Sequence, residues 1–333
     1  MPDELWVIGE PQGDGLARVS TEIATIVRRL GEASGRQVVG IVMGANPDRA
    51  AQELARYVPV VRAVTTPGTA DRTAAASAAS ELAALIGTGQ PSHVFLGATP
   101  DGRDLAGMLS ALLSWGVLVN ALEVGWGDAA GDGPGVEMSI FGGRLLTTSA
   151  FTGTQGIVTV RPNAAVAEPL AQPGRVESHE SSRAESLPAV TVLERVSEAG
   201  AALPIEEARI IVAGGRGVAG PEGFGLVQEL ADALGGAVGA TRAAVDAGWI
   251  PFAQQIGQTG KIVKPALYLA LGISGAIQHK VGMQTAEVIV AVNRDPDAPI
   301  AEYADLFVVG DLFEVGPAII AELRQRQGGS GGS

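Results

Sequence analysis

Cysteine is absent from the 333 residues of this chain. Its absence excludes disulfide bonds, thiolate nucleophiles, iron–sulfur clusters and thiol-ligated metals. Histidine is scarce too, with three in the chain and none at the spacing of a ligand pair, so we expect no metal site. Paired carboxylates, a Ser/His/Asp arrangement and a Walker loop are also missing from the sequence. This lack of catalytic groups fits a carrier better than a hydrolase.

Positive charge is in short supply, with 23 Lys and Arg against 36 Asp and Glu, a formal net charge of −13. No basic cluster is longer than Arg28-Arg29, which argues against nucleic-acid binding. Apolar runs stay well short of the roughly 18–20 residues that span a bilayer. The opening MPDELWVIGE resembles neither a signal peptide nor a transit peptide. We therefore expect a cytoplasmic protein with no direct membrane insertion.

The length predicts two domains, because a single compact core rarely grows to this size. Continuously apolar runs alternate with helical patterns in the first half, which indicates a mostly parallel, doubly wound sheet. Strands are expected at 5–9, 37–44, 60–66 and 93–99, and helices at 20–30, 48–57, 70–86 and 103–113. From Leu118 to Arg161, runs of alternating strand residues separated by turns predict an antiparallel extension.

A proline-rich, polar stretch at 162–205 indicates an interdomain connection, in which VTVLERV (190–196) could form one more strand. After it, further strand–helix units predict a second doubly wound α/β domain, with a helix at 221–234. We therefore expect an N-terminal domain at 1–200, a C-terminal domain at 206–327 and a flexible Gly/Ser tail at 328–333. Such sheets bind ligands beyond the carboxyl ends of their strands.

Glycine-rich loops follow several strands of the second domain. The loop GGRG (214–217) would bring Arg216 to a diphosphate, but it lacks the full dinucleotide fingerprint and is equally an ordinary turn. After the next strand, Thr241 is a good helix N-cap, and Arg242 could lie across an electron-accepting ring. In the loop 256–261, Gln258 and Thr259 can hydrogen-bond to the edge of a heteroaromatic ring.

The run GISGAIQH (272–279) combines a glycine turn with a helix that we expect to start at Ser274. Backbone N–H groups there suit a phosphate or a ring carbonyl. A lone helical histidine such as His279 is more often packed than functional. Further along, Asn293 is placed for a ribityl or adenylate contact, while Asp311 is equally explained as a helix cap.

Six blocks in chain order together resemble the alpha subunit of electron transfer flavoproteins. They are GGRG (214–217), TRAAVDAGW (241–249), IGQTGKIV (256–263), GISGAIQH (272–279), VNRDPDAPI (292–300) and GDLFEV (310–315). The resemblance implies that the second domain binds FAD and that a beta subunit bearing AMP completes a heterodimer. The first domain resembles the family through its strand pattern and the loop ATPDGRDLAG.

The resemblance also implies roles for individual residues. Arg216 would lie by the diphosphate, and Thr241 and Arg242 at the flavin, with the arginine over the ring. Around the isoalloxazine it places Ile256, Gly257, Gln258 and Thr259, with the Thr259 hydroxyl near N5. Around the ring and ribityl chain it places Ser274, Gly275, Ala276, Ile277, Gln278 and His279, with His279 facing the C2 carbonyl. Asn293 and Asp311 would reach the adenosine side.

The function implied is a non-catalytic electron carrier. Such a subunit passes single electrons from flavin dehydrogenases, including the acyl-CoA dehydrogenases of fatty acid beta-oxidation, to a membrane quinone oxidoreductase. Positive groups near a flavin favour its anionic one-electron reduced form. Two alternatives stay open on the sequence: an NAD(P)-binding dehydrogenase or transhydrogenase subunit, and a regulatory module that binds a nucleotide in the first domain.

Overall fold

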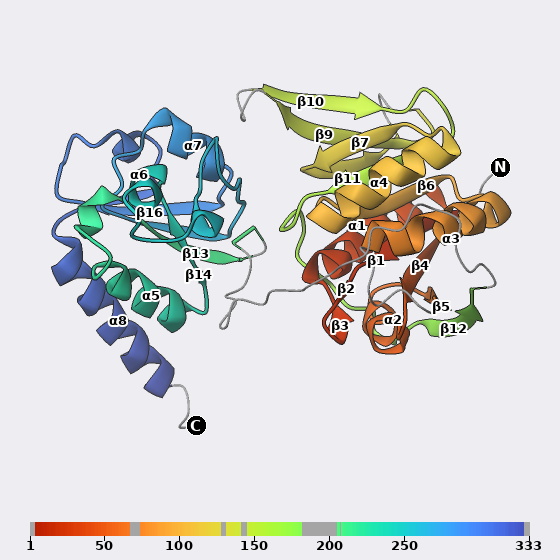
Figure 1. Cartoon of the computed structure of the whole chain (residues 1–333), viewed down its shortest axis with the longest axis horizontal. Helices are drawn as coiled ribbons and strands as arrows, with labels where there is room; N and C mark the ends of the chain where they lie inside the picture. Colours follow the sequence, from red (N-terminus) through yellow and green to blue (C-terminus); the bar gives the residue numbers. More distant parts are fainter. Residues whose placement is uncertain are drawn as a thin grey trace. The chain divides into compact units, whose positions relative to one another are not determined.

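A computed structural model describes residues 4–66, 74–127, 131–140, 145–181, 205–206 and 208–329. The chain divides into two compact units, one formed by the described residues up to 181 and one by those from 205 onward. Figure 1 shows a sheet with covering helices in each. The predicted fold class, two α/β units with mostly parallel sheets, is confirmed. The segments 190–196 and 70–73 and the boundary at residue 200 lie outside the described residues, so the domain boundaries stay a prediction.

The first unit is built on a seven-stranded sheet in which every neighbouring pair is parallel, in the order β12-β5-β4-β1-β6-β11-β7. Its strands are β1 (Glu4–Gly9), β4 (Gln37–Gly44), β5 (Val60–Thr65), β6 (His93–Gly97), β7 (Val117–Ala121), β11 (Gly156–Val160) and β12 (Arg175–Glu180). Its helices are α1 (Arg18–Ser34), α2 (Asp48–Leu54), α3 (Ala74–Gly89) and α4 (Pro100–Leu113).

Strand β1 shows why these strands are apolar throughout. Leu5 and Val7 pack into one core with α1 and α2, whereas Trp6 and Ile8 pack into a second core with α3 and α4. Successive side chains of a strand point to opposite faces, so a sheet covered on both sides buries all of them. The alternating strand and helix pattern was therefore readable in the sequence.

The antiparallel extension is a separate three-stranded sheet of β8 (Glu123–Trp126), β9 (Pro134–Ile140) and β10 (Leu145–Ala150). The flanking runs that we included in it, β7 and β11, belong to the parallel sheet instead. Every residue of β11 is buried, as expected between two parallel neighbours with helices on both faces. A two-residue hairpin, β2 (Pro11–Gln12) with β3 (Gly15–Leu16), completes this unit.

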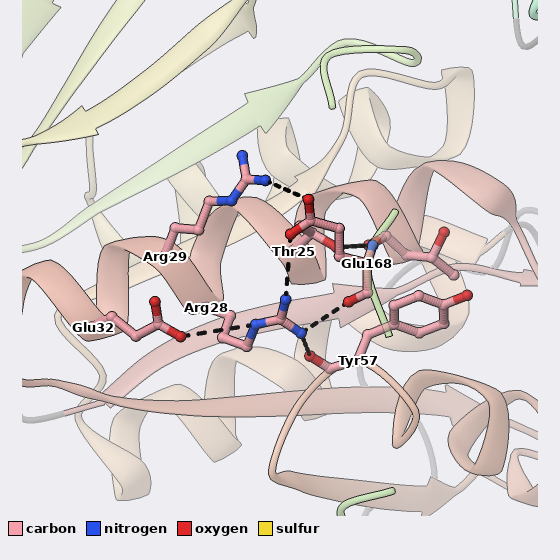
Figure 2. Close-up of polar contacts among 7 residues, drawn as sticks. Thr25, Arg28, Arg29, Glu32, Tyr57 and Glu168 are labelled. Carbon is pink, nitrogen blue, oxygen red and sulfur yellow. Dashed lines mark hydrogen bonds and ion pairs between the residues drawn. The ribbon is translucent and has the colours of Figure 1, made fainter. Parts of the chain in front are cut away.

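The chain after β11 is fastened to α1 by a polar network, shown in Figure 2. Arg28 donates hydrogen bonds from Nη1 to the carbonyl oxygens of Tyr57 (3.3 Å) and Glu168 (2.9 Å). The backbone N–H of Glu168 donates to Thr25 Oγ1 at 3.0 Å. On the outside, Arg29 binds the Glu168 carboxylate at 2.9 Å. The network joins three segments that are far apart in the sequence.

Replacing Arg28 by alanine should lower the free energy of unfolding of the first unit by about 2 kcal/mol, because two carbonyls lose a charged donor. The Arg28 side chain is only 16% exposed, whereas that of Arg29 is 56% exposed. Arg29→Ala should therefore stay within about 0.5 kcal/mol of the parent chain. Urea titrations of both variants would measure the difference. Equal losses would show that the bonds to the carbonyls contribute little.

The second unit contains a five-stranded parallel sheet in the order β14-β13-β15-β16-β17. Its strands are β13 (Ile210–Gly214), β14 (Ala237–Ala240), β15 (Leu267–Leu271), β16 (Val288–Asn293) and β17 (Leu306–Val309). The helices are α5 (Phe224–Leu234), α6 (Arg242–Asp246), α7 (Ile277–Met283) and α8 (Leu312–Gly329), and the 3-10 turns η2 (Arg216–Val218), η3 (Phe252–Gln254) and η4 (Pro299–Glu302). The strand order reverses between β13 and β15, the position where such sheets bind ligands.

Several helix ends differ from the sequence prediction. In the first unit, α1 spans 18–34 and not 20–30, α2 ends at 54 and not at 57, and α4 begins at 100 and not at 103. The helix expected at 221–234 begins at Phe224, and the one expected at Ser274 begins at Ile277. Gly272 and Gly275 have φ angles of +60° and +87°, in the left-handed region that a right-handed helix excludes, so the loop continues to Ala276. Helix α8 extends to Gly329, two residues into the predicted tail, and 330–333 lie outside the described residues.

Candidate functional site

The second unit has a pocket of about 590 Å³ at the carboxyl ends of its strands. Its walls are the loops that follow β13, β14, β15 and β16, together with the loop at 255–259. The volume is in the range of roughly 300–1,000 Å³ that is typical of ligand and cofactor sites. Of the predicted site residues, all except Ile277 and Asp311 line this pocket. The structure therefore brings together residues from five separate segments of sequence.

Two of the loops approach each other through glycine. The parallel register of β13 with β15 pairs Gly214 with Leu271, so the residues that follow them lie side by side. Gly217 donates its N–H to the carbonyl of Gly272 at 3.0 Å. A Cβ added at Gly217 would come within 2.5 Å of the Gly272 Cα atom. These glycines serve the close packing of backbone on backbone that shapes the crevice.

The loop with Gln258 and Thr259 is held by backbone bonds on both sides. Ile256 donates its N–H to Ala240 at 2.9 Å, and Gln258 donates its N–H to the carbonyl of Gln278 at 2.8 Å. Gln255, which is buried, donates through Nε2 to Thr259 Oγ1 at 3.1 Å. The Thr259 hydroxyl thus accepts a hydrogen bond from Gln255, and its own hydrogen is available for donation to a ligand in the pocket.

His279 is 6% exposed and both of its ring nitrogens have partners. Nδ1 lies 3.0 Å from the carbonyl oxygen of Ile256, which can only accept, so Nδ1 carries a hydrogen. Nε2 lies 2.9 Å from the hydroxyl of Tyr268, a fully buried residue of β15. Burial lowers the pKa of His279 to about 4, against a smaller upward effect of its bond to Ile256. His279 is therefore neutral near pH 7, with Nε2 accepting from Tyr268.

Two arginines bring positive charge to the pocket. Arg216 is exposed and forms no ion pair with any described residue. Arg242 Nε lies 3.1 Å from Asp246 Oδ2, one helical turn further along α6, and Asp246 also lines the pocket. Within the described ranges, no group of three His, Cys, Asp or Glu residues could hold a metal ion. The pocket combines cations, hydroxyl and amide groups and bare backbone, a set suited to a phosphorylated ligand with a polar ring.

The sequence matches two families along its length. Residues 5–186 match the electron transfer flavoprotein domain, and residues 204–284 match the electron transfer flavoprotein FAD-binding domain. The chain is 42% identical to the electron transfer flavoprotein subunit alpha of Mycobacterium tuberculosis over 98% of this chain and 99% of the relative. The chain belongs to the electron transfer flavoprotein family. It is also 37% identical to the alpha subunit of Bacillus subtilis, over 98% of each chain, and 36% identical to Protein FixB of Clostridium saccharobutylicum, over 96% of each.

As an electron transfer flavoprotein alpha subunit, the chain has a FAD-binding domain in its second unit, and FAD is its cofactor. An orphaned polar atom in the pocket is consistent with that cofactor. Thr241 Oγ1 is buried and has no hydrogen-bond partner among the described residues. Thr241 occupies the predicted N-cap position of α6, but its side chain makes no capping hydrogen bond. Its hydroxyl is therefore available to a ligand.

Two predicted residues of this flavoprotein lie outside the pocket lining. The Asp311 carboxylate accepts from the N–H of Phe313 at 2.9 Å and so caps α8, as its position in the sequence also suggested. Ile277 is 64% exposed at the start of α7. Asn293 does line the pocket, but its amide donates to Ile273 and accepts from Asp295, which shapes the loop. Contacts of all three with FAD stay predictions.

Sequence reasoning missed several lining residues of this family member, of which Asp246, Gln255 and Ala298 are the most informative. Gln255 immediately precedes a predicted loop, and Asp246 lies four residues after Arg242, a spacing that places both on one helical face. That spacing was a usable signal. Ala298 had none, because an alanine in a polar loop carries no chemical signature. Among the helices within the described residues, none is long and apolar enough to cross a membrane.

Proposed function

We propose that this chain is the electron-carrying subunit of a heterodimeric flavoprotein, with FAD held in the pocket of the second unit. The observation that carries the proposal is the convergence of Arg216, Arg242, Thr259 and His279 on one crevice. These residues lie in four separate segments of the sequence, and the fold brings them together at the carboxyl ends of parallel strands, where such sheets bind ligands. A beta subunit is the partner that an alpha subunit of this family implies.

When bound, FAD supplies a ring that can accept and release electrons one at a time. The residues of this chain bind and orient it. Thr259 and Thr241 offer hydroxyl groups to the ring, and Arg216 offers a fixed positive charge to the diphosphate. Arg242 brings a second positive charge to the ring. Since His279 is neutral near pH 7, the two arginines provide the positive charge that favours a reduced, anionic ring.

The electron donors that we propose are flavin dehydrogenases, such as the acyl-CoA dehydrogenases of fatty acid beta-oxidation, and the acceptor is a membrane quinone oxidoreductase. The chain then acts as a carrier with no catalytic residues of its own. The motifs quoted from the sequence and the membership in the family support this assignment. A cytoplasmic location stays a prediction from the sequence.

The first test is to co-express the chain with its beta subunit and to record absorbance during stepwise reduction. We expect a yellow protein whose flavin is reduced in two resolved one-electron steps. A colourless heterodimer, or tight binding of nicotinamide nucleotide without flavin, would refute the proposal.

A variant tests the orientation of the cofactor. Arg216→Ala should weaken FAD binding on the order of tenfold, because one charged contact to the diphosphate is lost. Binding of riboflavin, which has no phosphate, should not change. Arg324→Ala is a matched control, since Arg324 is exposed on α8 and does not line the pocket. Titrations of apoprotein with both flavins would give the affinities. An equal loss of affinity for FAD and for riboflavin would show that Arg216 does not contact the diphosphate.

A further inference from the structure

Asp246 is one of two acidic residues in the lining of a pocket that otherwise offers cations and neutral donors. Its Oδ2 atom lies 3.1 Å from Arg242 Nε, and both residues line the pocket from α6. Asp295, from the loop after β16, is the other acidic lining residue, and its Oδ1 atom accepts from the backbone N–H of Asp297. Asp246 is thus the carboxylate in the lining that is paired with an arginine.

The geometry of the ion pair leaves the terminal guanidinium nitrogens of Arg242 available. The carboxylate binds the inner nitrogen, Nε, and the terminal nitrogens of Arg242 have no other partner among the described residues. A guanidinium group has five N–H donors in a fixed plane. The bond at Nε therefore restrains the direction of that plane and leaves the four terminal N–H groups free for a ligand.

The strength of the ion pair decides how firmly Asp246 restrains Arg242. The two side chains are 66% and 62% exposed. Exposed ion pairs contribute about 0–1 kcal/mol, so this one restrains the arginine without locking it. A carboxylate at this distance also offsets part of the positive charge that Arg242 presents to the pocket. Asp246 thus affects both the orientation and the effective charge of Arg242.

We infer that Asp246 is a positioning residue that orients Arg242 toward the bound flavin and moderates its charge, so that it sets how strongly the site favours reduced over oxidised flavin. This inference rests on the proposed function, because it takes Arg242 to lie at the flavin. It assigns a role to a residue that acts on the cofactor chiefly through another side chain.

The test is Asp246→Asn in the heterodimer loaded with FAD. The asparagine keeps an oxygen that can accept from Nε but removes the negative charge. The ratio of affinities for reduced and oxidised flavin should rise by about two- to fivefold, the range that exposed ion pairs contribute. At 59 mV per tenfold for one electron, the midpoint potential should rise by up to about 40 mV. Spectroelectrochemical titration measures the potential directly.

Two further variants make the test specific. In an Arg242→Ala background the Asp246→Asn change should raise the potential clearly less, because only the direct effect of the Asp246 charge on the flavin remains and the part transmitted through the arginine is lost. Asp246→Glu should restore a potential close to that of the parent protein. Asp232→Asn is the matched control: Asp232 is an exposed aspartate on α5 that accepts from Gln228 at 2.8 Å, outside the pocket.

The outcomes separate this inference from the proposed function. An unchanged potential in Asp246→Asn, or an equal rise with and without Arg242, would overturn the role of Asp246 while leaving the carrier function intact. A parent heterodimer that binds no FAD would instead refute the proposed function itself. A rise that depends on Arg242 and is reversed by glutamate would establish the role.

Discussion

Gly217→Ala should lower the free energy of unfolding of the second unit by about 2–3 kcal/mol and weaken FAD binding on the order of 100-fold. The added Cβ would lie 2.5 Å from the Cα atom and 2.9 Å from the carbonyl oxygen of Gly272. Both atoms belong to backbone, which cannot rotate away as a side chain can. The loops after β13 and β15 would have to separate, and the lining residues that they carry would move with them.

Gly225→Ala is the control for this substitution. Gly225 is in α5, and nothing lies within 4 Å of an added Cβ there. Alanine is a better helix former than glycine, so this variant should be neutral or stabilised by up to about 1 kcal/mol. Denaturant titration and flavin fluorescence would provide the two measurements. If Gly217→Ala bound FAD as tightly as the parent, the contact between the two loops would not be what shapes the pocket.

Acidification from pH 6.5 to 4 should destabilise both units through one buried histidine in each. The pKa of His93 is lowered to about 4, first by burial and then by the charge of Arg36, and the pKa of His279 is lowered to about 4 by burial. Between these pH values the unfolded chain takes up a proton at each histidine, whereas the folded chain does not. Stability is therefore complete above pH 6.5 and is lost as the pH falls toward 4, by about 3 kcal/mol per histidine.

His93→Phe tests the contribution of the first unit. His93 is 1% exposed, its ring nitrogens have no partner among the described residues, and it lies between Trp126 (5.9 Å) and Phe151 (5.3 Å). A phenyl ring suits these surroundings and does not titrate. In this variant the free energy of unfolding should depend on pH roughly half as strongly between pH 6.5 and 4. Urea titrations at several pH values would measure this. An unchanged dependence would show that His93 does not carry it.

The sequence predicted most of the parallel strands because they are apolar on both faces. The same criterion failed for β12, whose residues RVESHE are mostly exposed. That strand is recognisable only by its pairing with β5 at the edge of the sheet. The extent of the antiparallel sheet was misjudged for a related reason. Whether β7 and β11 join neighbours in a parallel or an antiparallel direction depends on segments that are distant in the sequence.

Site prediction succeeded where loop chemistry follows a strand. Arg216 and Arg242 come shortly after apolar runs, and the carboxyl ends of parallel strands meet at one edge. Tyr268 shows the limit of this reasoning. It lies within an apolar strand, where the sequence predicts only a packing role. Its hydroxyl meets His279 because α7 lies next to β15 in the folded unit. The pairing that defines the protonation state of His279 could not be inferred from spacing.

The residues alone determined the fold class, the family and the loops that carry polar groups to the pocket, because hydropathy, glycine and chain order are properties of the sequence. Tertiary structure alone decided which atoms are already bonded and which are free. In the packed chain both ring nitrogens of His279 are hydrogen-bonded, Arg242 is paired with Asp246, and the hydroxyl of Thr241 has no partner among the described residues. The reason is physical: hydrogen bonding and burial depend on distances between segments, and those distances exist only after the chain has packed.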